Sequence, residues 1–270
     1  MTAIAPSKRR RPEIFGVQSA SARRRATLAA VSLATVLAIW MGLTEFGIVN
    51  TVLVPSPGDV FRAALAAIRD GSLLRNALAS LLRVLEGFTL ALVIAVPLGV
   101  LMGVSGNARG LVEPLIELLR PIPPIAFIPL AILWFGIGEF SKVLIIAYGA
   151  FFPIFVNTMA GFRDVDRVHI RAAQALGANR FDIFRDVALP SAFPQIVTGA
   201  RLGMGLAFIV LVAAELVAAS EGLGYLINDA RFSFRTDQIF VGMITIGLLG
   251  LVLNKALLEA ERRLLRWKSQ

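Results

Sequence analysis

The sequence predicts an all-α, polytopic membrane protein with about six transmembrane helices. Of its 270 residues, 57% are hydrophobic and 17% are charged, and the mean hydropathy is +0.75. Soluble domains are typically roughly 45–50% apolar and about 25% charged. The apolar residues also fall in long blocks, as the hydrocarbon core of a bilayer requires. We therefore expect one membrane domain rather than one or two soluble domains.

Six blocks are apolar enough to cross about 30 Å of hydrocarbon as helices, which takes roughly 20 residues each. They cover residues 26–46, 77–104, 111–137, 143–162, 195–219 and 239–258. Four prolines interrupt the third block, at positions 121, 123, 124 and 129, and each removes a backbone donor. Lipid tolerates such a break only where protein or water satisfies the freed carbonyls. We expect this span to be kinked and to face the bundle interior, either lining a path through the membrane or serving as a kinked structural helix.

Basic residues indicate the orientation in the membrane. The net charge is +9, and seven Lys and Arg residues fall within the first 25 positions. No small-residue cleavage site follows them, so we expect residues 1–25 to be a disordered basic tail and residues 26–270 to be the membrane domain. Lys and Arg are much more frequent in segments on the side of the N-terminus than on the other side. The positive-inside rule therefore predicts that both termini are cytoplasmic.

A short amphipathic helix is expected between the first two spans. Ser56 can cap it, Pro57 suits the first helical position, Asp59 favours the positive end of the helix dipole, and Gly71 ends it. Its apolar face is expected to comprise Val60, Phe61, Leu65 and Ile68. Such a helix either lies along the outer membrane surface or packs on the other spans.

Small and charged residues inside the spans give further expectations. Gly99 with Gly103, and Gly199 with Gly203, have the spacing that permits close helix packing. Arg83 and Glu86 lie three apart on one helical face, so we expect a local ion pair. Glu215 falls near the outer end of the fifth span, where it either serves transport or faces water.

The cytoplasmic segment 163–194 is too polar to span the membrane and has the pattern of two short helices. The first covers 165–176, with Asp166 near its start and Gly177 as its stop. Asn179 can cap the second helix, and Pro190 is expected to end it. The residues expected to share one face of the second helix are Phe181, Phe184 and Val187.

This segment resembles the EAA loop of ABC importer permeases. Its pattern is Arg171-Ala172-Ala173, three residues, Gly177, nine residues and then Val187-Ala188-Leu189-Pro190. The family pattern is E-A-A, three residues, G, nine residues and I-x-L-P, so the spacing matches throughout. Arg171 replaces the glutamate, which puts one acidic contact with the ATPase in doubt.

The resemblance extends over residues 54–258 and points to the permeases that import nitrate, taurine and aliphatic sulfonates. It is carried by the stretches 54–57, 133–138 and 151–158, and by Glu215 with 222–227. It implies the type I importer fold, an inner-membrane location, and a second permease copy. It also implies two ATP-binding subunits and an extracytoplasmic solute-binding protein as partners, with a small anion as the solute.

The resemblance also implies where the functional residues lie. The residues expected to couple this chain to the ATPase are Arg171, Ala172, Ala173, Gly177, Phe181, Phe184, Leu189 and Pro190. Position in the spans, and not the resemblance, gives the candidates for the translocation path: Trp134, Phe135 and Asn157 lie in or next to the proline-broken span, and Glu215 is ionisable at membrane depth. We expect no enzymatic activity, catalytic residue or bound cofactor, because no lysine follows a glycine as a P-loop requires, and ATP is then used by the partner. His169 is the single histidine and Cys is absent, so no metal site is expected.

Other readings of these features predict different patterns. A self-contained secondary transporter or channel would carry intramembrane ionisable relays and inverted repeats, and a membrane-embedded enzyme would carry clustered catalytic residues. An ordinary cytoplasmic hairpin could imitate segment 163–194, as could a helix-turn-helix DNA reader. Nucleic acid is excluded as a partner because the basic residues flank membrane spans.

Overall fold

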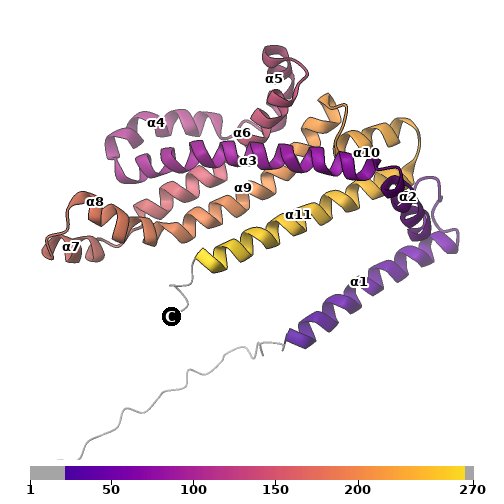
Figure 1. The fold of residues 1–270 in the computed structure, drawn as a ribbon, viewed down its shortest axis with the longest axis horizontal. Coiled ribbons are helices and arrows are strands. Elements are labelled where there is room, and N and C mark those ends of the chain that lie inside the picture. The colour runs from indigo at the N-terminus through magenta and orange to yellow at the C-terminus, as the bar shows by residue number, and fades with distance from the viewer. Residues whose placement is uncertain (1–21, 265–270) are drawn as a thin grey trace, which may run out of the picture.

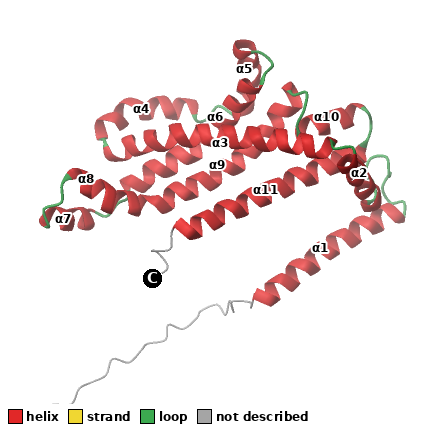
Figure 2. Ribbon diagram, in the orientation of Figure 1, coloured by secondary structure: helices red, strands yellow, loops and turns green. Residues whose placement is uncertain are grey.

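The computed structural model describes residues 22–264, and these residues form helices and loops without a strand among them (Figures 1 and 2). The helices are α1 (Ala22–Glu45), α2 (Pro57–Arg69), α3 (Ser72–Val104), α4 (Gly106–Leu119), α5 (Ile128–Phe135), α6 (Glu139–Arg163), α7 (Arg167–Ala175), α8 (Arg180–Asp182), α9 (Leu189–Ala218), α10 (Leu223–Phe232) and α11 (Thr236–Leu264). Five helical segments are long and apolar enough to cross a membrane, and the bent pair α4–α5 makes up to six. The predicted all-α fold with about six spans is confirmed. The predicted basic tail lies almost entirely outside the described residues.

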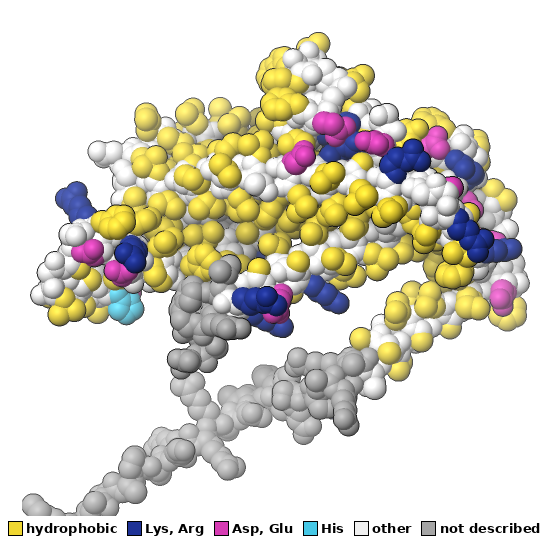
Figure 3. Space-filling model, in the orientation of Figure 1, with side chains coloured by type: hydrophobic (Ala, Val, Ile, Leu, Met, Phe, Trp, Pro, Cys, Tyr) yellow, Lys and Arg dark blue, Asp and Glu magenta, His cyan; other side chains and the backbone are white. Residues whose placement is uncertain are grey.

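The centre of the molecule is a layer of three long helices, with α6 packed between α3 and α9. Its fully buried side chains include Val84 of α3, Ile146 and Phe155 of α6, and Leu211 of α9. Hydrophobic side chains also cover much of the face shown in Figure 3, while charged ones gather toward the ends of the bundle and beside the base of α5. An apolar exterior around an apolar core is the arrangement that lipid permits.

The two glycine pairs bring these helices together as predicted. A Cβ atom at Gly103 would lie 2.5 Å from Cβ of Phe162, and one at Gly99 would lie 2.8 Å from Cβ of Thr158, so both glycines permit the close contact of α3 with α6. Gly199 and Gly203 perform the same function between α9 and α6, against residues 153–157 and 150–154. Close packing of backbones at small residues is a principal source of helix association in membranes.

Helix α1 runs apart from this layer and approaches the rest of the molecule near its C-terminal end, beside α2 and α11 (Figure 1). There the Trp40 ring stacks on Phe240 at a centroid distance of 5.4 Å, and its Nε1 donates to the carbonyl of Pro55 at 3.0 Å. Thr44 is the one described α1 side chain that is buried. The rest of the helix is therefore free to contact lipid or another chain.

The short helix α2 begins as the sequence predicts. Ser56 and Asp59 form a reciprocal capping box, and Pro57 occupies the first turn. On the predicted apolar face, Val60 is buried against α11 in a cluster with Ala63 and Val241. The remaining members of that face, Phe61, Leu65 and Ile68, are exposed. Helix α2 therefore both packs on the spans and presents an apolar stripe outward.

The third predicted span is broken, as its prolines require. Helices α4 and α5 are bent by 83° at residues 120–123, and a single 3₁₀ turn, Pro124–Phe127, leads into α5. The predicted interior position is correct only for Ile128 and Ala131 of α5, since no side chain of α4 is buried. Most of this span therefore lies on the surface of the single chain.

Candidate functional site

The hairpin made by α7, α8 and the π-helical turn η2 (Ile183–Ala188) lies at the opposite end of the bundle from α2 and α10 (Figure 1). Asp166 caps α7 by accepting from the backbone N–H of Val168 at 2.8 Å. Gly177 has a φ of 83°, which lets the chain reverse, and Asn179 with Asp182 forms the capping box that starts α8. The predicted caps at Asp166 and Asn179 and the predicted stop at Gly177 are therefore confirmed.

The prediction that Pro190 ends the second helix is wrong. Residues 180–218 form one continuous helical segment of 39 residues. The π-helical turn immediately before α9 shifts the hydrogen-bond register, and Pro190 falls in the first turn of α9, where a missing N–H is tolerated. The hairpin is therefore a direct extension of α9.

The two phenylalanines of the hairpin have different surroundings. Phe184 stacks on Phe162 of α6 at a centroid distance of 5.7 Å, in a cluster with the buried Ala188 and Ala192. Phe181 is 67% exposed. Among the other predicted coupling residues, Arg171, Ala172 and Gly177 are exposed, whereas Ala173, Leu189 and Pro190 are half-buried. His169 is also exposed on this hairpin (cyan in Figure 3).

The predicted path residues do not meet at one point. Asn157 lines a cavity of about 610 Å³ between the break of α4–α5, the middle of α6 and the middle of α9. Trp134 lines a separate apolar cavity of about 390 Å³ with Tyr148 and Phe152. Phe135 is half-exposed and packs edge-on against Phe140.

Sequence reasoning missed two arginines inside the spans. Arg120 lies at the break after α4 and lines the same cavity as Asn157, and its guanidinium has no ion pair or side-chain hydrogen bond among the described residues. Arg201 of α9 pairs with Glu261 of α11 and lines a third cavity, of about 330 Å³, together with Asn254. The signal was present in the sequence, because both positions fall within predicted spans, where an ionisable residue suggests a function.

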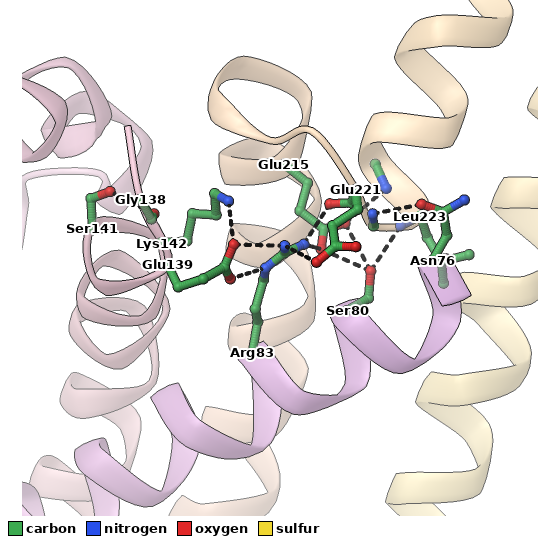
Figure 4. A network of polar contacts seen from close by, with 12 residues as sticks. Asn76, Ser80, Arg83, Gly138, Glu139, Ser141, Lys142, Glu215, Glu221 and Leu223 are labelled. Atoms are coloured by element: carbon green, nitrogen blue, oxygen red, sulfur yellow. Dashed lines mark hydrogen bonds and ion pairs between the residues drawn. The ribbon is translucent and has the colours of Figure 1, made fainter. Parts of the chain in front are cut away.

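Glu215 instead belongs to a buried polar network (Figure 4), which lies at the end of the bundle opposite the hairpin. Its side chain is 0% exposed and pairs with Nη1 of Arg83 at 2.7 Å. Arg83 also binds the carboxylate of Glu139, through Nε at 2.5 Å and Nη2 at 2.9 Å, and the carbonyl of Glu221 at 2.6 Å. The predicted local pair of Arg83 with Glu86 is therefore wrong, and so is the alternative in which Glu215 faces water.

Backbone donors complete this network. Ser80 Oγ donates to Glu215 at 2.8 Å and accepts from the N–H of Leu223 at 2.8 Å, while the N–H of Gly224 donates to Glu215 at 2.8 Å. The N–H of Gly222 donates to Asn76 Oδ1 at 2.8 Å. Side chains of α3 and α9 thus satisfy the free N–H groups at the start of α10, which would otherwise be unpaired in a buried position. The network fastens α3, α6, α9 and α10 together at the end opposite the hairpin.

No group of three or more potential metal-ligating side chains occurs among the described residues. The geometry thus comprises a structural clamp at one end, a cavity with one unpaired arginine midway, and an exposed hairpin at the other end.

Comparison with known proteins places the chain in a family. The model described as "Binding-protein-dependent transport system inner membrane component" matches residues 95–264, more than half of the chain. The taurine transport system permease protein TauC of Escherichia coli (strain K12) is 37% identical over 92% of each chain. The putative aliphatic sulfonates transport permease protein SsuC of Bacillus subtilis (strain 168) is 36% identical over 87% of this chain and 86% of that protein.

More distant proteins agree with this placement. The nitrate import permease protein NrtB of Synechocystis sp. is 32% identical over 84% of each chain. An inward-facing structure of the MetNI methionine ABC transporter shares the fold, with a TM-score of 0.58 and 23% identity over 73% of this chain and 96% of that chain. The chain therefore belongs to the family of inner-membrane components of binding-protein-dependent transport systems, and it is a multi-pass α-helical permease with the type I ABC importer fold.

Proposed function

We propose that this chain is the membrane-spanning subunit of an ATP-driven importer that carries a small anion, of the sulfonate, taurine or nitrate kind, by alternating access. The names of the relatives support this class of solute. The subunit works as two identical copies with two ATP-hydrolysing subunits and an extracytoplasmic solute-binding protein. ATP is used by the partner, and this chain supplies the path.

The exposed surface of the hairpin is the observation that carries this proposal. Phe181, Val168 and Leu176 are 67%, 64% and 88% exposed, although they lie on a polar segment outside the apolar spans. Exposed apolar side chains on a projecting helical hairpin suit a groove on another protein. Phe184 holds the hairpin against α6, so Phe181 is the apolar side chain of this pair that is available to a partner.

The distribution of charge supports cytoplasmic termini. Arg167, Arg171, Arg180 and Arg185 lie on the hairpin, and Arg262 and Arg263 lie in the last turn of α11. Positive side chains next to spans are retained on the cytoplasmic side. Fusions at the C-terminus test this orientation, because a fluorescent reporter should be active there and a periplasmic phosphatase reporter should be inactive. The reverse pattern would refute it.

The coupling role is tested with two phenylalanines that are almost equally exposed at opposite ends of the molecule. Phe181 on the hairpin is 67% exposed and Phe61 on α2 is 70% exposed. The Phe181→Ala permease should retain much less ATPase subunit on purification and show lower uptake, since an apolar anchor is removed. Phe61→Ala should leave the complex intact.

Thermal unfolding of both variants shows whether the fold has survived. If Phe181→Ala and Phe61→Ala retain the ATPase equally well, the hairpin is not the docking element. If no ATP-hydrolysing subunit co-purifies with the wild-type chain, the importer proposal itself fails. A bulky residue at Gly177, where φ is 83°, should also impair coupling.

A further inference from the structure

We infer that Arg120 and Asn157 form an anion-binding point midway through the membrane, in the cavity between the break of α4–α5 and helices α6 and α9. The inference rests on the proposed function in taking the solute to be an anion. The inference adds two things to that proposal: the position at which this chain contacts the solute, and the positive charge that favours an anionic solute.

The cavity has the size and the position of a transport site. Its volume of about 610 Å³ lies within the range of small-molecule sites, roughly 300–1,000 Å³. Asn157 lies in the inner half of α6, and Leu202 lies near the middle of α9. The cavity therefore opens at the depth of the hydrocarbon core and not at the rim of the bundle.

Its lining carries one charge. The lining residues are Arg120, Ile122, Pro124, Gly149, Phe152, Pro153, Val156, Asn157, Leu202, Gly205 and Leu206. Arg120 is the single ionisable residue in this set, and Glu117, one turn earlier on α4, makes no ion pair with it within 4.0 Å. The lining is therefore positively charged.

The other cavities differ in this respect. Arg201 lines the cavity beside α11 but is neutralised by Glu261. A fourth cavity, between the start of α6 and the end of α9, is lined by Lys142 and by its ion-pair partner Glu139, at 2.8 Å. The cavity beside Trp134 has an almost entirely apolar lining. Of the four, the cavity at Arg120 is the one whose charge is not balanced within the described chain.

An unbalanced guanidinium at this depth favours an anionic partner. A charged side chain within the membrane is costly unless a counter-charge or water is present. A planar guanidinium can donate two parallel hydrogen bonds to an oxyanion such as a sulfonate, carboxylate or nitrate. Asn157 donates one amide hydrogen to the carbonyl of Pro153 at 2.8 Å, which leaves the second for the solute.

The absence of cysteine from the chain permits a direct test. Leu202 lines the cavity and is 54% exposed, so Leu202→Cys introduces a single thiol there. The purified permease is treated with an anionic methanethiosulfonate that carries a sulfonate group, and separately with a cationic one that carries trimethylammonium. A nearby unpaired charge should favour the anionic reagent by about three- to tenfold, corrected for the reagents' rates with free thiol.

Charge variants then identify the source of the preference. Arg120→Gln should abolish it and Arg120→Lys should retain it. Arg75→Gln, which removes an exposed arginine at the outer start of α3, should leave it unchanged. Equal rates for the two reagents, or a preference that persists in Arg120→Gln, would overturn the inference. Equal rates would also be found if a carboxylate of a second copy neutralised Arg120, and in that case too Arg120 would not be available to bind an anion.

Uptake separates this inference from the proposed function. With the cognate ATPase and binding protein in vesicles, uptake of taurine, methanesulfonate or nitrate should fall about tenfold in Arg120→Gln relative to Arg75→Gln, and Arg120→Lys should recover part of it. If the wild-type complex imports none of these anions, the proposed solute class fails, whatever the thiol assay shows. If wild type and Arg120→Gln import them equally, the Arg120 site fails and the importer stands.

Discussion

Replacing Arg83 with methionine should destabilise the folded permease by about 3–5 kcal/mol, the usual effect of breaking a buried ion pair by removing one partner. Methionine retains much of the arginine stem and removes its charge. The substitution leaves the Glu215 carboxylate, whose side chain is 0% exposed, with only Ser80 and the N–H of Gly224 as donors. Glu139 contributes less to this loss because its side chain is 58% exposed and water can solvate it.

Thermal unfolding in lipid nanodiscs, followed by intrinsic tryptophan fluorescence, measures the effect. For a chain of this size, each kcal/mol corresponds to roughly 2–4 °C, so Tm should fall by about 6–20 °C. The double variant Arg83→Met/Glu215→Gln no longer buries an unpaired charge and should recover at least half of that loss. Arg62→Met, at an exposed pair with Asp59, is the matched control and should change Tm by less than about 2 °C.

Two outcomes would refute this reasoning. If Arg83→Met unfolds within about 2 °C of the wild type, Glu215 is not held as a buried charge. If the double variant is no more stable than the single one, the loss comes from packing around the arginine stem and not from an unpaired carboxylate.

Three further predictions follow from the same structure. Gly103→Leu should lower Tm by several degrees, because its Cβ would lie 2.5 Å from a carbon of α6, whereas Gly110→Leu, in open space, should not. Gly177→Ala should cost about 1–2 kcal/mol locally, since its φ is 83°, and amide exchange should therefore increase in residues 167–188. The Ser56 hydroxyl holds the pKa of Asp59 below its ordinary value of 3.8, so the stabilisation is complete above that value and is lost as the pH falls through the lower folded pKa. Amide-exchange protection of α2 should consequently decrease below about pH 4, and Ser56→Ala should weaken this pH dependence.

Features that depend on neighbouring residues could be predicted from the sequence. The capping boxes at Ser56 and Asn179, the reversal at Gly177 and the break after α4 each follow from residue types within one turn of helix. The spans themselves follow from the length of apolar blocks. The glycine pairs indicated close contacts, although not which helix each would meet.

Features that depend on distant residues could not be predicted. Arg83 was expected to pair with Glu86, but its partners Glu139 and Glu215 are 56 and 132 residues away. Helical spacing identifies neighbours on the same helix and carries no information about other helices. Pro190 was misread for a related reason, because a π-helical turn places it in the first turn of α9, and no short-range rule predicts that turn.

The arrangement of these parts offers a route by which the proposed movement of the hairpin would reach the proposed solute site. The hairpin joins the C-terminal end of α6 to the start of α9, and the same two helices line the cavity at Asn157 and Leu202. At about 1.5 Å per residue, these positions lie roughly 9 Å and 20 Å along their helices from the hairpin. The clamp around Arg83 joins the far ends of both helices, so a displacement at the hairpin end would tilt them about that clamp. The cavity at Arg120 lies between the displaced end and the fixed end, where such a tilt changes its width.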